Sequence, residues 1–161
     1  MMSVLTGVMF VLELALFSIP SVQLTFLLML IYSRILGTPK TMIIIFVHVL
    51  LDTVLFGGLM SFYMGSMLFG YMLIPIMANT IFKRVENVYV LALFSGLSAV
   101  LYAWSFIPPT MLLYNIDVWL YLMADIPFTA VLVINNFIAT IVLYKPLTRI
   151  FKEYFIGEIQ Y

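Results

Sequence analysis

The 161-residue sequence contains no cysteine, and only 9% of its residues are charged. The absence of cysteine excludes a small secreted domain that is held together by disulfides. Soluble domains have about 25% charged residues, so the low fraction here excludes an ordinary soluble protein. A disordered chain is also excluded, because 65% of the residues are hydrophobic and disordered segments have low hydrophobicity. The remaining class is an integral membrane protein, with the lipid bilayer as its environment.

Equal numbers of basic and acidic residues, seven of each, provide no basic surface of the kind that nucleic-acid binding requires. The sequence also lacks a glycine-rich phosphate loop, a nucleophile elbow and a His-Glu-x-x-His motif. We therefore predict no nucleic-acid partner, no enzymatic activity and no cofactor for this chain.

Long apolar runs are separated by short segments that contain polar residues, glycine or proline. A membrane-spanning helix needs about 20 mainly apolar residues, and these runs do not alternate as the strands of a membrane barrel would. We predict an all-α integral membrane protein in which residues 1–161 form a single membrane domain. Its six transmembrane helices are expected near residues 3–19, 22–37, 41–56, 64–82, 87–107 and 119–147.

The positions of the basic residues predict an orientation. All seven flank or occupy the second and fourth connections or lie at the end of the last helix: Arg34, Lys40, Lys83, Arg84, Lys145, Arg149 and Lys152. With six spans these three places share one side of the membrane, which the positive-inside rule identifies as the cytoplasm. Both termini are therefore predicted to be cytoplasmic.

Four ionisable residues lie inside the predicted spans, where a charge is costly and marks a candidate site: Glu13, His48, Asp52 and Asp125. Each of the three acids could contact a ligand or hold helices together. His48 and Asp52 are four residues apart and share one helical face, where the carboxylate can orient the imidazole. We favour a structural pair over a ligand site or a proton relay. One histidine, no cysteine and no close acidic cluster argue against a metal site, and none is predicted.

The last predicted helix carries polar residues at two levels. Asp125 precedes Pro127, so it could cap a main span that runs from Pro127 to Lys145. Asn136 is about three turns further on and points the same way as Asp125. Because two adjacent amides are not expected to face lipid together, Asn135 or Asn136 should face the bundle, to bond another helix or a polar solute.

Two connections on the predicted outer side, residues 56–65 and 107–119, are apolar and aromatic. Such segments lie in the membrane interface or fold over a cavity as a lid. Together with the acids in the outward half, they favour an outward-opening pocket for a small solute. Ser3 and Gly7 are small residues spaced by four, which indicates close helix packing or a docking face for another membrane protein.

Three parts of the sequence carry a family resemblance: SIPSVQLT at 18–25, LDTVLFGG at 51–58, and ADIPF at 124–128 followed by Asn135-Asn136 and YKPL at 144–147. Over essentially its full length the chain resembles a substrate-binding S component of an energy-coupling factor (ECF) vitamin transporter. It is most like the members assigned to hydroxymethylpyrimidine or pyridoxine.

The resemblance implies a six-helix protein of the bacterial cytoplasmic membrane that captures a vitamin or vitamin precursor from outside. Uptake would be driven by two cytoplasmic ATPase subunits through a transmembrane scaffold subunit. Gly57 and Gly58 fall in a loop that would gate the solute. Ser3-x-x-x-Gly7 stands where the family typically has an Ala-x-x-x-Ala pattern for scaffold contact.

A flat heteroaromatic solute needs aromatic walls and a few hydrogen bonds. Our hypothesis assigns the walls to Tyr114 and Trp119, the hydrogen bonds to Asp52, Asp125 and Asn136, and a further contact to Glu13. The alternative is a non-transporting membrane scaffold, such as a rod-shape-determining subunit of cell-wall synthesis. An independent channel is a weaker interpretation, because no row of polar residues crosses a whole span.

Overall fold

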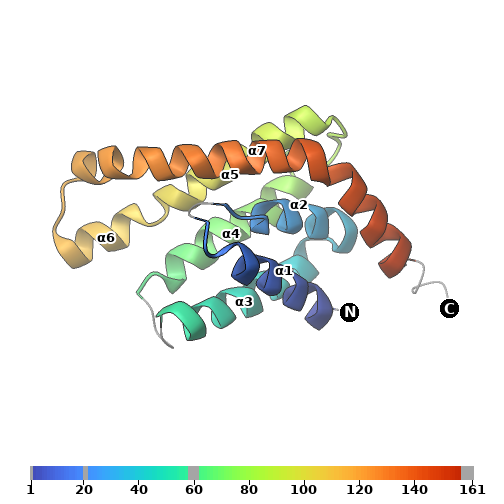
Figure 1. Cartoon of the computed structure of the whole chain (residues 1–161), viewed down its shortest axis with the longest axis horizontal. Helices are drawn as coiled ribbons and strands as arrows, with labels where there is room; N and C mark the ends of the chain where they lie inside the picture. Colours follow the sequence, from blue (N-terminus) through green and yellow to red (C-terminus); the bar gives the residue numbers. More distant parts are fainter. Residues whose placement is uncertain (1, 20–21, 58–61, 157–161) are drawn as a thin grey trace.

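The computed structural model describes residues 2–19, 22–57 and 62–156, and its regular elements are all helical (Figure 1). This confirms the predicted all-α class. The elements are α1 (Met2–Leu16), α2 (Thr25–Leu36), α3 (Thr38–Asp52), a π-helix η1 (Thr53–Gly57), α4 (Met64–Asn79), α5 (Val88–Trp104), α6 (Ile107–Tyr114) and α7 (Val118–Ile156).

Three helical stretches are long and apolar enough to cross a membrane: Thr38–Leu55, Val88–Tyr114 and Val118–Tyr154. The other apolar helices, α1, α2 and α4, have 15, 12 and 16 residues. The three long stretches indicate a membrane protein. The count of six spans and the side on which the termini lie stay predictions.

The short helix α2 forms the centre of the bundle. Its first nine residues, from Thr25 to Ser33, are all buried, because α2 packs against α3, α4, α5 and α7. A helix that is apolar all round is expected in such a place. Gly37 alone joins α2 to α3 and has φ = 81°, a backbone conformation that glycine adopts at little cost.

Polar contacts tie two basic connections together at one end of the bundle. The Arg34 guanidinium at the end of α2 donates to the backbone carbonyls of Phe82, Lys83 and Val85. The Asn79 amide donates to the Ser33 carbonyl and to Thr38 Oγ1. In Figure 1 the start of α1 and the last part of α7 lie toward the same end.

The structure corrects the sequence interpretation of the last connection and of the last helix. Residues 107–114, predicted to be part of a connection, form α6, with a proline pair at its start that suits the first helical turn. The helix α7 runs without a break for 39 residues, through Pro127 and beyond residue 147 to Ile156.

Asp125 therefore does not cap a helix that starts at Pro127, and that prediction is wrong. The capping role belongs to Asp117. Its Oδ1 accepts a hydrogen bond from the Trp119 backbone amide at 2.8 Å, and its carbonyl accepts from the Tyr121 amide in the first turn of α7. A side-chain oxygen that receives the amide two residues on is the usual N-cap arrangement.

Candidate functional site

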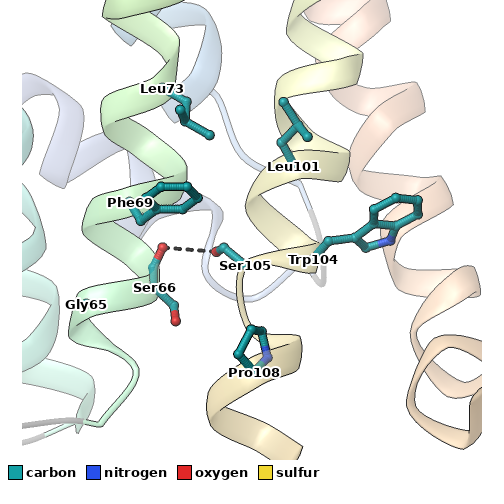
Figure 2. Close-up of a pocket in the computed structure, with 8 residues that line it drawn as sticks. All are labelled: Gly65, Ser66, Phe69, Leu73, Leu101, Trp104, Ser105 and Pro108. Atoms are coloured by element: carbon teal, nitrogen blue, oxygen red, sulfur yellow. Dashed lines mark hydrogen bonds between the residues drawn. The ribbon is translucent and has the colours of Figure 1, made fainter. Parts of the chain in front are cut away.

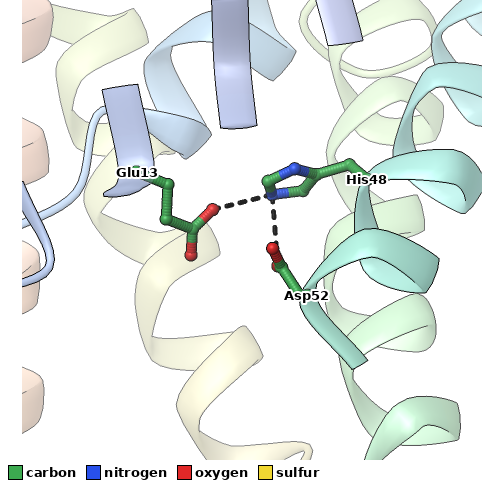
Figure 3. Close-up of side chains that lie close together, drawn as sticks. All are labelled: Glu13, His48 and Asp52. Atoms are coloured by element: carbon green, nitrogen blue, oxygen red, sulfur yellow. Dashed lines mark ion pairs between the residues drawn. The ribbon is translucent and has the colours of Figure 1, made fainter. Parts of the chain in front are cut away.

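Glu13 of α1 meets His48 and Asp52 of α3 in a cluster inside the bundle (Figure 3). His48 Nε2 lies 2.8 Å from Glu13 Oε2 and 3.4 Å from Asp52 Oδ2. His48 is fully buried, Asp52 is 4% exposed, and the Glu13 side chain is 16% exposed. We call these three residues the acid–histidine cluster.

Three elements position the cluster. The i,i+4 spacing in α3 puts His48 and Asp52 on one face, and α1 packs along that helix. Thr25 at the start of α2 donates from Oγ1 to Glu13 Oε2 at 3.4 Å. The π-helix η1 begins directly after Asp52, and π-helical turns are frequent at functional sites.

Aromatic rings line the inner side of the cluster. The His48 ring lies 6.2 Å from that of Tyr71 and 6.4 Å from that of Phe10, measured between ring centroids. Tyr71 of α4 stacks on Tyr102 of α5 at 4.4 Å, and Phe26 of α2 meets both tyrosines edge-on. The surroundings of the cluster are thus largely aromatic and are built by every helix from α1 to α5.

The cluster has polar atoms that the described part of the chain does not satisfy. Both ring nitrogens of His48 and both carboxylate oxygens of Asp52 are buried and make no hydrogen bond of good geometry. Burying such groups without a partner costs free energy, and buried charges are normally paired or bound to metal. The arrangement can therefore bind a proton, a cation or the hydrogen-bond donors of a solute.

The expectation that there is no close acidic cluster is wrong. Glu13, His48 and Asp52 each present one ligand atom, and these atoms lie within 4.8 Å of one another. The error has a simple cause, since Glu13 is distant from the α3 pair in the sequence and only the packing of α1 on α3 brings them together.

Three other predicted binding residues, Tyr114, Trp119 and Asp125, lie elsewhere. Trp119 and Asp125 line a groove of about 560 Å³ between α5 and α7, where Asp125 accepts a hydrogen bond from Thr129 Oγ1. Trp119 is 71% exposed, and Tyr114 at the end of α6 is 63% exposed. These two aromatic residues do not form the walls around Asp52.

Asn136 is fully buried. Its side-chain amide donates to the Leu132 carbonyl of its own helix at 2.8 Å, and its Oδ1 has no partner within the described residues. Asn135 donates to the Gln23 carbonyl at 2.8 Å. The expectation that one of the two amides faces the bundle is confirmed, and Asn135 ties α7 to the segment before α2.

Gly57 is the last residue of η1, whereas Gly58 lies outside the described residues. Ser3 and Gly7 line a groove of about 350 Å³ between α1 and α3.

A further pocket, of about 420 Å³, lies between α4, α5 and the start of α6 (Figure 2). Its lining is mainly apolar, with Phe69, Leu101 and Trp104 among the side chains. There Ser105 Oγ donates to the Ser66 carbonyl at 2.9 Å.

Sequence reasoning missed the aromatic residues at the acid–histidine cluster: Phe10, Phe26, Tyr71 and Tyr102. Among 14 phenylalanines and 10 tyrosines, no local signal distinguishes these four. The place of His48 in an apolar span marks it as a candidate, and its contact with Asp52 is as predicted. Comparisons with protein-family models, with curated proteins and with solved structures find no match to this chain.

Proposed function

We propose that this chain is the substrate-binding S component of an ECF-type transporter, and that it binds a small vitamin or vitamin precursor from outside the cell for ATP-driven uptake. The observation that carries the proposal is the acid–histidine cluster, which lies beside stacked aromatic rings inside the bundle. The sequence resemblance given above supports the family, and the three helices long enough to cross a membrane are consistent with it.

The cluster suits a flat heteroaromatic solute such as hydroxymethylpyrimidine or pyridoxine. The unsatisfied oxygens of Asp52 can accept hydrogen bonds from the amino or hydroxyl groups of such a ring. Tyr71 and Tyr102 already stack on each other, and Tyr71 is fully buried, so in this proposal the solute packs against the outer side of this stacked pair. In this proposal they replace Tyr114 and Trp119 as the walls of the site.

The position of the cluster along α3 supports capture from the outer side. Asp52 lies 12 residues after Lys40 in the same helix, or about 18 Å along its axis. If the end with the basic residues lies in the cytoplasm, as the positive-inside rule requires, the cluster is in the outer half of the membrane.

The groove between α1 and α3 supports the docking of a scaffold subunit. Ser3 is exposed, and a Cβ added at Gly7 would meet no atom within 4 Å. Small residues that leave such room allow a second membrane helix to approach closely. The two ATPase subunits would supply ATP hydrolysis, for which this chain has no motif.

The binding test uses the purified chain and thermal unfolding in the presence of hydroxymethylpyrimidine or pyridoxine. A solute that binds only the folded state at 100 times its Kd stabilises that state by about 2.7 kcal/mol. We expect one of these solutes to raise Tm. The shift should be lost in Asp52→Asn and retained in Asp125→Asn, which removes the same charge in the α5–α7 groove.

No shift with any B-group vitamin or precursor would contradict the proposal, and an unchanged shift in Asp52→Asn would remove the cluster from the site. Copurification distinguishes the transporter from the alternative function, a membrane scaffold of cell-wall synthesis. The transporter predicts two ATPases and a membrane scaffold subunit, whereas a cell-wall scaffold predicts enzymes of cell-wall synthesis.

A further inference from the structure

We propose that the acid–histidine cluster is a binding site for a divalent transition-metal ion, held by Glu13 Oε2, His48 Nε2 and Asp52 Oδ2. This goes beyond solute capture, because the chain would hold the ion whether or not a solute is present. The ion could later serve as an attachment point for a solute, since three protein ligands leave coordination positions open.

The spacing of the donor atoms is that of a metal site. Metal–nitrogen and metal–oxygen bonds in tetrahedral zinc sites are about 2.0–2.2 Å long, so two donors on one ion lie about 3.4 Å apart. His48 Nε2 lies 3.4 Å from Asp52 Oδ2, which equals this value, and 2.8 Å from Glu13 Oε2, which is about 0.6 Å shorter. All three donor atoms lie within 4.8 Å of one another, so one ion can reach each of them after small side-chain movements.

The direction of the imidazole supports the same conclusion. Nε2 makes no hydrogen bond of good geometry with either carboxylate, although both oxygens are near. Figure 3 shows Glu13 and Asp52 approaching this nitrogen from different sides. A nitrogen flanked by two carboxylate oxygens can give its lone pair to an ion that replaces the proton between them.

A cation would neutralise the charge of the cluster. Two ionised carboxylates beside a neutral imidazole would carry two negative charges, and His48 and Asp52 are buried. Such charges are very costly at membrane depth unless they are neutralised. Arg34 and Lys40 do not supply the neutralising charge, because they lie at the other end of α2 and near the start of α3. A divalent ion would neutralise the cluster completely.

The donor set indicates the class of ion. Calcium and magnesium take oxygen ligands, whereas an imidazole with two carboxylates suits zinc, iron, nickel or cobalt. His48 is the only histidine of the chain, and there is no cysteine. Any nitrogen-ligated ion must therefore sit at this cluster, which makes the site unusually simple to test.

The experiment uses the full chain in detergent, purified through a tag without histidine, stripped with a chelator and titrated with Co²⁺. We expect visible absorption bands that saturate at one Co²⁺ per chain and disappear on addition of Zn²⁺. Loss of a second-shell partner alone weakens metal binding by about 10–100-fold. Glu13→Gln, Asp52→Asn and His48→Gln should therefore each weaken Co²⁺ binding by more than about 100-fold. Glu86 is an exposed acid in the α4–α5 connection, so Glu86→Gln should leave Co²⁺ binding unchanged.

A second measurement covers the case in which a variant does not fold. In the unmodified chain, Zn²⁺ should shift the NMR signals of the single imidazole and raise Tm. Absence of both effects, or saturable Co²⁺ binding that survives His48→Gln, would overturn the proposal. Metal binding without any vitamin-induced Tm shift would support the ion site and count against the proposed transport function. The opposite result is a Tm rise with a vitamin in metal-free protein, unchanged by Zn²⁺, and no Co²⁺ bands. That result would support the transport function and count against the ion site.

Discussion

Replacing Gly70 by alanine should destabilise the fold through a clash that the structure locates. An added Cβ would lie 2.9 Å from Tyr102 Cδ2, 3.0 Å from Tyr102 Cα and 3.2 Å from Ser105 Oγ, whereas carbon atoms pack best at about 3.5–4.0 Å. The ring cannot turn away freely, because it stacks on Tyr71 at 4.4 Å and meets Phe26 edge-on. The backbone atom moves only if α4 and α5 separate.

The magnitude follows from two opposing terms. Alanine gains about 1 kcal/mol over glycine inside a helix, and overpacking a tight contact costs about 1–3 kcal/mol. Gly70→Ala should therefore lose up to about 2 kcal/mol of the free energy of unfolding. Gly65 in the same helix has no atom within 4 Å of an added Cβ, so Gly65→Ala should gain up to about 1 kcal/mol.

Reversible unfolding of both variants in mixed micelles, followed by circular dichroism, measures the difference. Helix propensity largely cancels between the two substitutions, so a difference of about 1–3 kcal/mol reports the clash itself. The same displacement of Tyr102 should weaken vitamin binding in Gly70→Ala. Equal stability of the two variants would refute the close approach of α4 and α5 at this point.

Two further substitutions test how the ends of the helices are held. Arg34→Lys loses the planar guanidinium that donates to three carbonyls of the α4–α5 connection. We expect the free energy of unfolding to fall by about 1–3 kcal/mol in the same assay. The control Arg84→Lys, at an exposed residue, should change it very little. Asn87→Ala removes the N-cap that accepts from the Tyr89 amide at 2.9 Å and should cost about 1 kcal/mol, whereas Asn87→Asp, which keeps the capping oxygen, should remain close to the original stability.

The all-helical class was predictable because long apolar runs leave few alternatives. Helix boundaries were less predictable where the sequence offered two possible start residues for one helix. Asp125-Ile126-Pro127 has the pattern of a helix start, yet Asp117 caps α7 and the helix continues through the proline. In a membrane bundle, neighbouring groups can satisfy the backbone that a proline frees, so proline is a weaker stop signal there than in a soluble protein.

The candidate site was predictable only within one helix. The spacing of His48 and Asp52 gave their contact correctly, because α-helical geometry fixes it. The third member, Glu13, and the stacked Tyr71 and Tyr102 depend on how separate helices pack. Neither spacing nor hydropathy carries that information. Tyr114 and Trp119 were chosen for their chemistry, but they are exposed in the structure.

The buried helix α2 is shorter than a helix that spans a bilayer. Its 12 residues extend for about 18 Å, whereas the hydrocarbon core of a bilayer is about 30 Å thick. Because neighbouring helices cover α2, Thr25 beside Glu13 at one end and Arg34 at the other do not need lipid-compatible surroundings. In a bilayer, the length of α2 would set the distance between an occupant of the acid–histidine cluster and the basic end of the bundle.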